Sequence, residues 1–116
     1  MGINVYLKPE SLVIAQEKQY SPGFYIRESY GLQPYPSQYL FSECFKNNSC
    51  SFNYTYELLK SRLLKTLNLA IERMNNDNSL YETDEIKFIF DSYIKFVENI
   101  KKYESKGIKC KVTISY

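Results

Sequence analysis

The two ends of the chain alternate between apolar and polar residues, as half-buried β-strands do. Residues 3–8 carry Ile, Val and Leu at the odd positions and Asn, Tyr and Lys at the even ones. Residues 108–116 alternate in the same way, with Lys109 and Lys111 on the polar side. A period of two residues predicts a strand with one buried face. Pro9 ends the first strand because it has no N–H to donate to a neighbouring strand.

Apolar residues at three- and four-residue spacing predict two amphipathic helices in the second half of the chain. The first covers about residues 54–75. The second begins near Thr83, whose hydroxyl can cap it, and ends at Gly107. Apolar side chains cover more than half the circumference of the second helix, so we expect the sheet on one side of it and the first helix on another. The stripe of the first helix consists of Leu59, Leu63, Leu67, Ala70, Ile71 and Met74, and that of the second of Ile86, Phe90, Tyr93, Val97 and Ile100.

These elements predict an α+β fold. We expect one small domain over residues 1–116, with the two helices packed on a small sheet in which the N- and C-terminal strands lie side by side. One or two further strands are expected near residues 12–15 and 24–28. The chain shows no internal repeat and no linker.

Composition argues against most catalytic and metal chemistry. The 116 residues include no His, and 15 Lys and Arg stand against 13 Asp and Glu, a net charge of +2. Without His the chain lacks the commonest general base and metal ligand. Cys44, Cys50 and Cys110 show no paired spacing and are interpreted as reduced thiols. The acidic group Asp77, Glu82, Asp84 and Glu85 is interpreted as the start of a helix. We therefore expect no metal, no cofactor and no catalytic residue.

The same features indicate the compartment and exclude some partners. The first residues lack the basic and long apolar regions of a signal peptide, and no apolar run is long enough to span a membrane. We expect a cytoplasmic protein, in the host cytoplasm if a phage encodes it. A net charge of +2 gives no reason to expect membrane or direct nucleic-acid binding. Lys109 and Lys111 are interpreted as solvated side chains of an edge strand.

One segment is not explained by folding alone. Residues 20–45 hold several tyrosines among Pro and Gly residues, which favour turns and extended chain over helix. Arg27 and Glu28 lie within this segment, and on a strand their side chains point to opposite faces. Two hypotheses remain open. In one, the tyrosines only fill a thin core. In the other, Tyr and Arg form a surface that stacks a ring and holds a phosphate, or that binds another protein.

Three short motifs resemble those of a family of small uncharacterised bacterial and phage proteins. They are GINVY at residues 2–6, YIRESY at residues 25–30 followed by Pro34-Tyr35, and ISY at residues 114–116. The family has Gly where this chain has Phe24, and His where it has Gly31, so an acid–base role at position 31 is absent here. No activity is assigned to the family. The resemblance implies the candidate ligand- or partner-binding residues: Tyr25, Arg27, Glu28, Tyr30, Tyr35 and Tyr116.

Three function classes follow. We favour a non-catalytic protein of phage or mobile-element type that sequesters a nucleotide-like, phosphate-bearing ligand. The alternative is an inhibitor or immunity protein that blocks a nuclease, a CRISPR effector or a toxin through the same surface. An enzyme is the least favoured class, since it would depend on Glu28 with Glu43, or on Cys44 or Cys50 as a nucleophile. The broad apolar girth of the second helix also suggests a homo-oligomer.

Overall fold

The computed structural model describes residues 2–18, 20–28, 36–46, 51–75 and 83–115. It confirms the α+β fold, with two main helices packed on an antiparallel sheet that contains both terminal strands. None of the helices in these ranges is long and apolar enough to cross a membrane. The strands are β1 (Ile3–Pro9), β2 (Tyr25–Glu28), β3 (Ser51–Asn53) and β4 (Cys110–Ser115); the helices are α1 (Leu12–Glu17), α2 (Pro36–Leu40), α3 (Ser42–Lys46), α4 (Tyr56–Asn75) and α5 (Thr83–Glu104).

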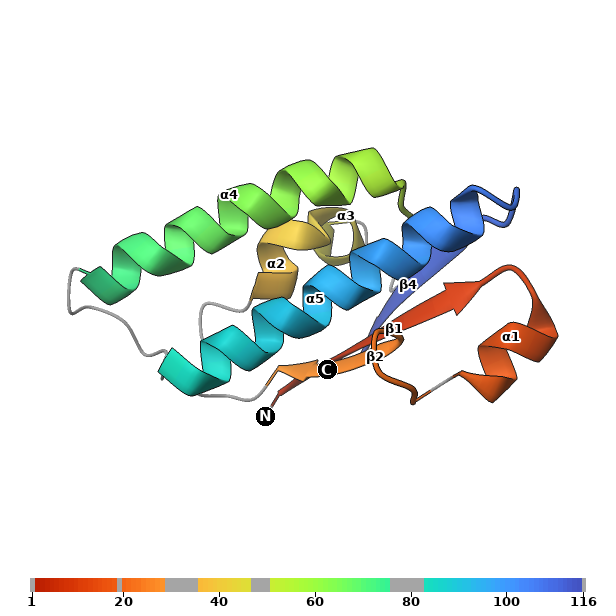
Figure 1. Ribbon diagram of the computed structural model, residues 1–116, viewed down its shortest axis with the longest axis horizontal. Helices are drawn as coiled ribbons and strands as arrows, with labels where there is room; N and C mark the ends of the chain where they lie inside the picture. The colour runs from red at the N-terminus through yellow and green to blue at the C-terminus, as the bar shows by residue number, and fades with distance from the viewer. Residues whose placement is uncertain (1, 19, 29–35, 47–50, 76–82, 116) are drawn as a thin grey trace.

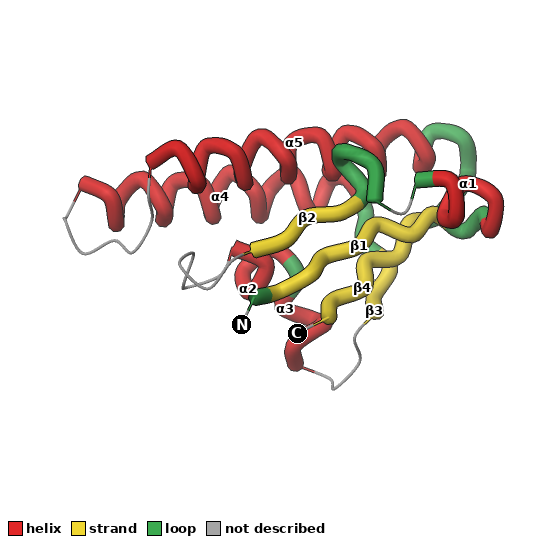
Figure 2. The backbone as a smooth tube through the Cα atoms, turned by 90° about the horizontal axis from the view of Figure 1, so that it is seen from below, coloured by secondary structure: helices red, strands yellow, loops and turns green. Residues whose placement is uncertain are grey.

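The sheet has the strand order β2-β1-β4-β3 (Figure 2). Every neighbouring pair of strands is antiparallel. The terminal strands β1 and β4 pair from Asn4 with Ser115 to Pro9 with Cys110, so the predicted neighbourhood of the two ends is confirmed. The interpretation of Lys111 as part of an edge strand is wrong, because β4 lies between β1 and β3.

The core lies between one face of the sheet and α5. The odd positions of β1 and the even positions of β4 are buried, which confirms the predicted alternation. From α5, the side chains of Phe90, Tyr93, Phe96 and Ile100 are buried against them. Figure 1 shows α5 between the sheet and α4, as its apolar girth predicts. Burying such side chains contributes roughly 1.5–3 kcal/mol each and holds the two layers together.

Helix α4 packs on α5 in the opposite direction, and both helices extend past the sheet at the end where α5 begins (Figures 1 and 2). This projection makes the molecule elongated, with extents of 44 × 26 × 26 Å. Leu59 is fully buried, as its stripe predicts, but Ile71 is 47% exposed. The predicted stripe is therefore wrong at Ile71, which lies in the last turns of α4.

The prediction of a strand near residues 12–15 is wrong, because this segment forms α1. Val13 and Ile14 suggest a strand by their β-branched side chains. Ser11 overrides that preference: it has extended backbone angles, and its hydroxyl accepts the backbone N–H of Ile14 at 3.5 Å. This bond satisfies a donor that the first turn of a helix leaves without a partner. The strand expected near residues 24–28 is confirmed as β2.

The expectation of turns and extended chain in place of helix for residues 20–45 is also wrong, since α2 and most of α3 lie within this range. Pro36 occupies the first position of α2, where a missing N–H costs nothing. The next N–H, that of Ser37, donates to both carboxylate oxygens of Glu28 at 2.9 and 3.0 Å. The cap of α2 therefore comes from β2, nine residues earlier in the chain.

A polar network ties α3 to α4. The Arg62 guanidinium donates to the Glu43 carboxylate at 2.6 Å and to the carbonyl oxygen of Leu40 at 3.0 Å. The hydroxyl of Tyr54 donates to the same carboxylate at 2.8 Å. The hydrogen bonds from Arg62 lower the pKa of Glu43 to about 2. Glu43 therefore stays ionised at neutral pH and is used within the fold.

Two glycines in the left-handed region test how closely β2 is fitted to α5. Gly23 has φ +82°, and a Cβ there would lie 2.5 Å from Asn99 Nδ2, which donates to the Gly23 carbonyl oxygen. Gly107 has φ +76° with nothing within 4 Å of such a Cβ. We expect Gly107→Ala to lower the free energy of unfolding by about 1 kcal/mol through backbone strain alone. Gly23→Ala should cost at least about 1 kcal/mol more, because Asn99 must also move.

Urea unfolding of the two variants measures this difference. Equal losses of stability in the two variants would show that Asn99 adjusts without cost. That result would contradict a close fit of β2 to α5.

Candidate functional site

The face of the sheet that points away from α5 is exposed or half-buried, and we call it the open face. Cross-strand pairing arranges its side chains in rows. One row holds Arg27, Asn4 and Ser115, and the next holds Tyr25, Tyr6 and Thr113. The last row holds Lys8, Lys111 and Asn53. An aromatic row thus lies between two rows that carry cations.

Three tyrosine rings gather on the open face. The rings of Tyr6 and Tyr25 lie 5.1 Å apart with an interplanar angle of 33°. Tyr20 stands nearly perpendicular to both, at 6.3 Å from Tyr6 and 5.5 Å from Tyr25, and is 68% exposed. The three rings therefore present aromatic surfaces in two orientations, which suits contact with a planar ring.

Asn4 orients the polar groups beside these rings. Its side-chain oxygen accepts the hydroxyl of Tyr25 at 2.7 Å and a guanidinium N–H of Arg27 at 3.1 Å. Arg27 is exposed. Because a guanidinium has five N–H donors, the bond to Asn4 fixes its direction and leaves donors for a ligand. In the described part of the chain, no carboxylate forms an ion pair with Arg27.

The open face is positively charged although the whole chain is nearly neutral. Lys8, Arg27 and Lys111 point outward, and none of the described strands places an acidic residue at an outward position. Lys8 stands directly opposite Lys111 on the neighbouring strand. Like charges in this arrangement repel each other and destabilise a sheet. An anionic ligand would offset this repulsion.

The tyrosine cluster and Arg27 also affect each other electrostatically. Burial raises the pKa of the Tyr6 hydroxyl, and neighbouring Tyr25 and Tyr20 raise it further, while the Arg27 guanidinium acts in the opposite direction. Tyr6 therefore stays neutral at physiological pH. The rings contribute contact surface and hydrogen bonds, and the charge of the open face comes from its lysines and Arg27.

The structure brings together only part of the predicted site. Tyr25 and Arg27 share the open face, while Glu28 points to the opposite side of the sheet and is fully buried. Tyr30, Tyr35 and Tyr116 lie outside the described residues. The prediction that Arg27 and Glu28 face opposite sides is confirmed, and it separates Glu28 from any ligand on the open face.

Glu28 forms a buried polar group with Ser37 and Tyr93, and none of the three side chains is exposed to solvent. Burial raises the pKa of Glu28 to about 7, although the bonds from Ser37 act in the opposite direction. The hydroxyls of Ser37 and Tyr93 have no hydrogen-bond partner among the described residues. Glu28 therefore holds α2 in place, and its ionisation is costly.

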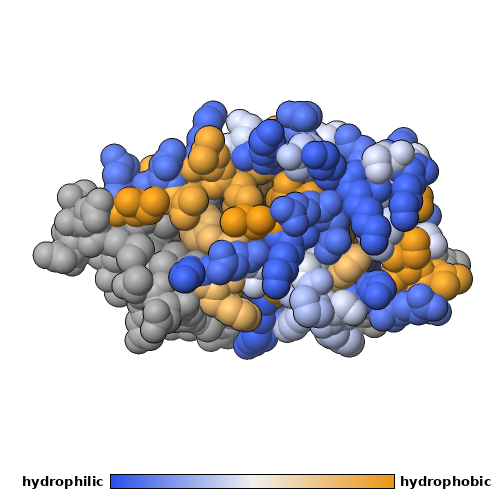
Figure 3. Space-filling view, in the orientation of Figure 1, coloured by the Kyte–Doolittle hydropathy of each residue, from blue (hydrophilic) through white to orange (hydrophobic). Residues whose placement is uncertain are grey.

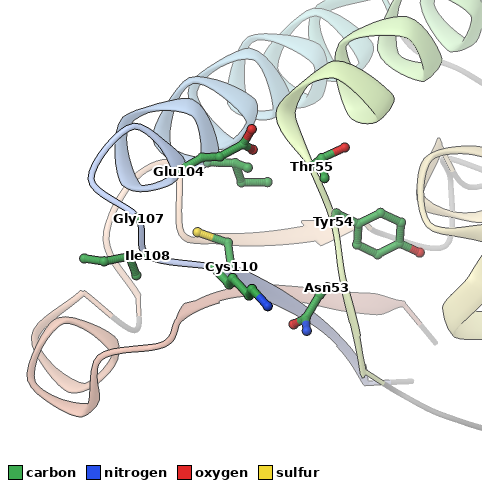
Figure 4. A pocket seen from close by; sticks show the side chains of 9 residues that line it. Asn53, Tyr54, Thr55, Glu104, Gly107, Ile108 and Cys110 are labelled. Carbon is green, nitrogen blue, oxygen red and sulfur yellow. The ribbon is translucent and has the colours of Figure 1, made fainter.

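A cleft of about 420 Å³ lies where α5 ends and β4 begins (Figure 4). Asn53, Glu104, Ile108 and Cys110 are among its lining residues, and the ring of Tyr54 points away from it (Figure 4). Burial raises the pKa of Cys110 to about 11, so this thiol is neutral and a poor nucleophile. Glu104 accepts the backbone N–H of Tyr56 at 3.0 Å, at the start of α4. Glu104 therefore serves the fold.

A second surface feature is apolar. Figure 3 shows apolar side chains gathered over the α4–α5 pair. Leu64 on α4 is 63% exposed, and Phe88 on α5 is 70% exposed. Nothing in the described structure indicates what covers these side chains, and the homo-oligomer stays a prediction.

Several residues of the open face are not among the predicted binding residues, because the polar side of a single strand looks like an ordinary solvated face. Asn4, Tyr6 and Lys8 are the polar side of the first predicted strand, and Lys111 is on the polar side of the last. The predicted pairing of the two strands was enough to place these residues on one surface. Tyr20 could not be found this way, because it reaches the face from the segment between α1 and β2.

Comparison with protein-family models, curated proteins and solved structures finds no match. The family resemblance of the three motifs therefore stays a prediction. In the described ranges, no group of three or more Cys, Asp or Glu residues could hold a metal ion.

The raised pKa of Glu28 predicts how stability depends on pH. The ordinary pKa of 4.5 applies to the unfolded chain and about 7 to the folded one, so the folded state binds this proton more tightly. Protonated Glu28 therefore contributes about 3 kcal/mol to the free energy of unfolding below about pH 4.5, and this contribution is lost as the pH rises to about 7. Glu28→Gln keeps an oxygen that accepts the Ser37 N–H but does not titrate.

Urea unfolding of both proteins from pH 4.5 to 7.5 tests this expectation. The stability of the natural protein, relative to the variant, should fall across this range. Glu43 does not interfere, since its pKa of about 2 places its loss of stability at lower pH. A constant difference would mean that Glu28 is ionised in the folded protein throughout.

Proposed function

We propose that this protein is a non-catalytic binding protein whose open face takes a nucleotide-like, phosphate-bearing ligand. The observation that carries the proposal is the exposed Arg27 guanidinium, which Asn4 orients beside Tyr25 on a face without an outward acidic residue in the described strands. A planar guanidinium with free donors matches the oxygens of a phosphate.

The tyrosine rings supply the second half of the recognition. A base or a similar ring can pack against Tyr20 or against the Tyr6–Tyr25 pair while its phosphate bonds to Arg27. Stacking of a base on an aromatic side chain is worth about 1–3 kcal/mol. Together with a charge-assisted bond, this is enough to hold a small ligand on a surface that no deep pocket needs to enclose.

The placement of Glu28, Glu43 and Cys110 supports a role without turnover. Glu28 is buried beneath α2, and Glu43 is held by Arg62 on the other side of the sheet. Cys110 is protonated in its cleft. Sequestration requires affinity alone, and in a phage or mobile element it would remove a nucleotide signal from the host.

A protein inhibitor is the second candidate, and one observation favours it. Tyr6, Tyr20, Tyr25 and Arg27 stand on the surface of a sheet and line neither the cleft near Cys110 nor a neighbouring one at Tyr56. Surfaces of this shape suit protein partners, and Tyr and Arg often dominate the energy of such interfaces.

A thermal-shift panel of cyclic, linear and ADP-ribose-type nucleotides tests the proposal. We expect at least one nucleotide to raise the melting temperature, and we expect Arg27→Ala to abolish the shift. Arg27→Lys should retain only part of it, because Lys lacks the planar pair of donors. Lys65→Ala, an exposed change on α4, is the matched control and should leave the shift intact.

If no nucleotide of the panel raises the melting temperature, the proposal is contradicted. A co-purifying protein that Arg27→Ala releases would then support the inhibitor.

A further inference from the structure

The open face carries positive charge on both sides of its aromatic row, and a single nucleotide phosphate contacts only one of these sides. Arg27 lies beside Asn4, and Lys8 lies beside Lys111. Asn4 and Lys8 are four residues apart on β1, which separates the two cationic rows by about 13 Å. Tyr6 lies between them on the same strand, with Tyr25 and Thr113 opposite it.

The Lys8–Lys111 pair is the part of this face that a single phosphate at Arg27 does not explain. The two residues are paired across neighbouring strands, and both are exposed. The ammonium group of Lys8 also lies 5.7 Å from the centre of the Tyr6 ring, so positive charge borders the aromatic row directly. A second phosphate at this place would relieve the repulsion between the lysines.

We infer that the ligand is an oligonucleotide with at least two phosphates, one at Arg27 and another at Lys8 and Lys111, with a base against the tyrosine row between them. This inference rests on the proposed function, since it extends the same site from one nucleotide to a chain of them. Recognition is by phosphate charge and by stacking, both of which tolerate any base sequence.

The net charge of the whole chain gave no reason to expect such a ligand. Fifteen basic and 13 acidic residues nearly cancel. The fold, however, places Lys8, Arg27 and Lys111 outward on one face, with no acidic residue among the outward positions of its described strands. A phosphate chain responds to this local charge, because salt screens more distant charges beyond about 10 Å at 0.1 M.

Two sources share this chemistry, a linear single strand and a cyclic oligonucleotide. Fluorescence anisotropy with a labelled four-nucleotide oligothymidylate and, separately, with a labelled cyclic dinucleotide, each in competition with thymidine monophosphate, separates them. We expect either the linear or the cyclic probe to bind at least about tenfold more tightly than the monophosphate at roughly 50 mM salt.

Variants assign the second phosphate to the lysine pair. Lys8→Ala and Lys111→Ala should each lower the affinity for the oligonucleotide by about fivefold or more at low salt. Each should also reduce the slope of log affinity against log salt by about 0.7. Neither should change the affinity for thymidine monophosphate, whereas Arg27→Ala should weaken both ligands. Lys65→Ala on α4 is again the control. Both lysine variants should fold, because each removes a repulsion.

The outcomes are distinguishable. Equal affinities for the monophosphate and the oligonucleotides, unaffected by Lys111→Ala, would overturn this inference and leave the proposed function intact. Binding of no nucleotide of any length would overturn both. If Lys111→Ala lowers the affinity for the oligonucleotide and leaves the affinity for the monophosphate unchanged, the two-phosphate site is established.

Discussion

The structure depends on one constraint, the alternation of side chains in strands whose other face is packed against α5. Val5, Ile26 and Val112 point into the core, and the residues between them must therefore point outward. The apolar face supplies stability and fixes the register of the strands, since a shift by one residue would expose the whole core. The open face is positioned by this packing although it contributes little to it.

Within the sheet, β2 links the packed and the open faces. Arg27 lies on the open face with Asn4, and the next residue, Glu28, is buried against α5 and caps α2. The position of the Arg27 backbone is thus fixed by interactions on the far side of the sheet. This pairing explains why adjacent residues in one short motif have different roles, one available to a ligand and the other required by the fold.

The polar features of the protein divide in the same way. Glu43, Arg62 and Tyr54 form hydrogen bonds with one another between α3 and α4, and Glu104 caps the start of α4. Such groups have partners and are explained by the fold. The Lys8–Lys111 pair differs from them, since it brings like charges together on neighbouring strands. This contrast, more than the number of tyrosines, singles out the open face.

The sequence alone determined the main architecture. The alternation at both ends and the stripes of the long helices are strong local patterns, and they specified β1, β4, α4 and α5 and the class of the fold. Only the tertiary structure decided that Pro36–Leu40 forms a helix, because the distant Glu28 accepts the N–H of Ser37 in its first turn. It also decided that Tyr20 joins Tyr6 and Tyr25, and that Lys111 lies on an inner strand beside Lys8. The physical reason is that helix caps and the register between strands join residues far apart in the chain, and a local pattern carries no information about the distances between such residues.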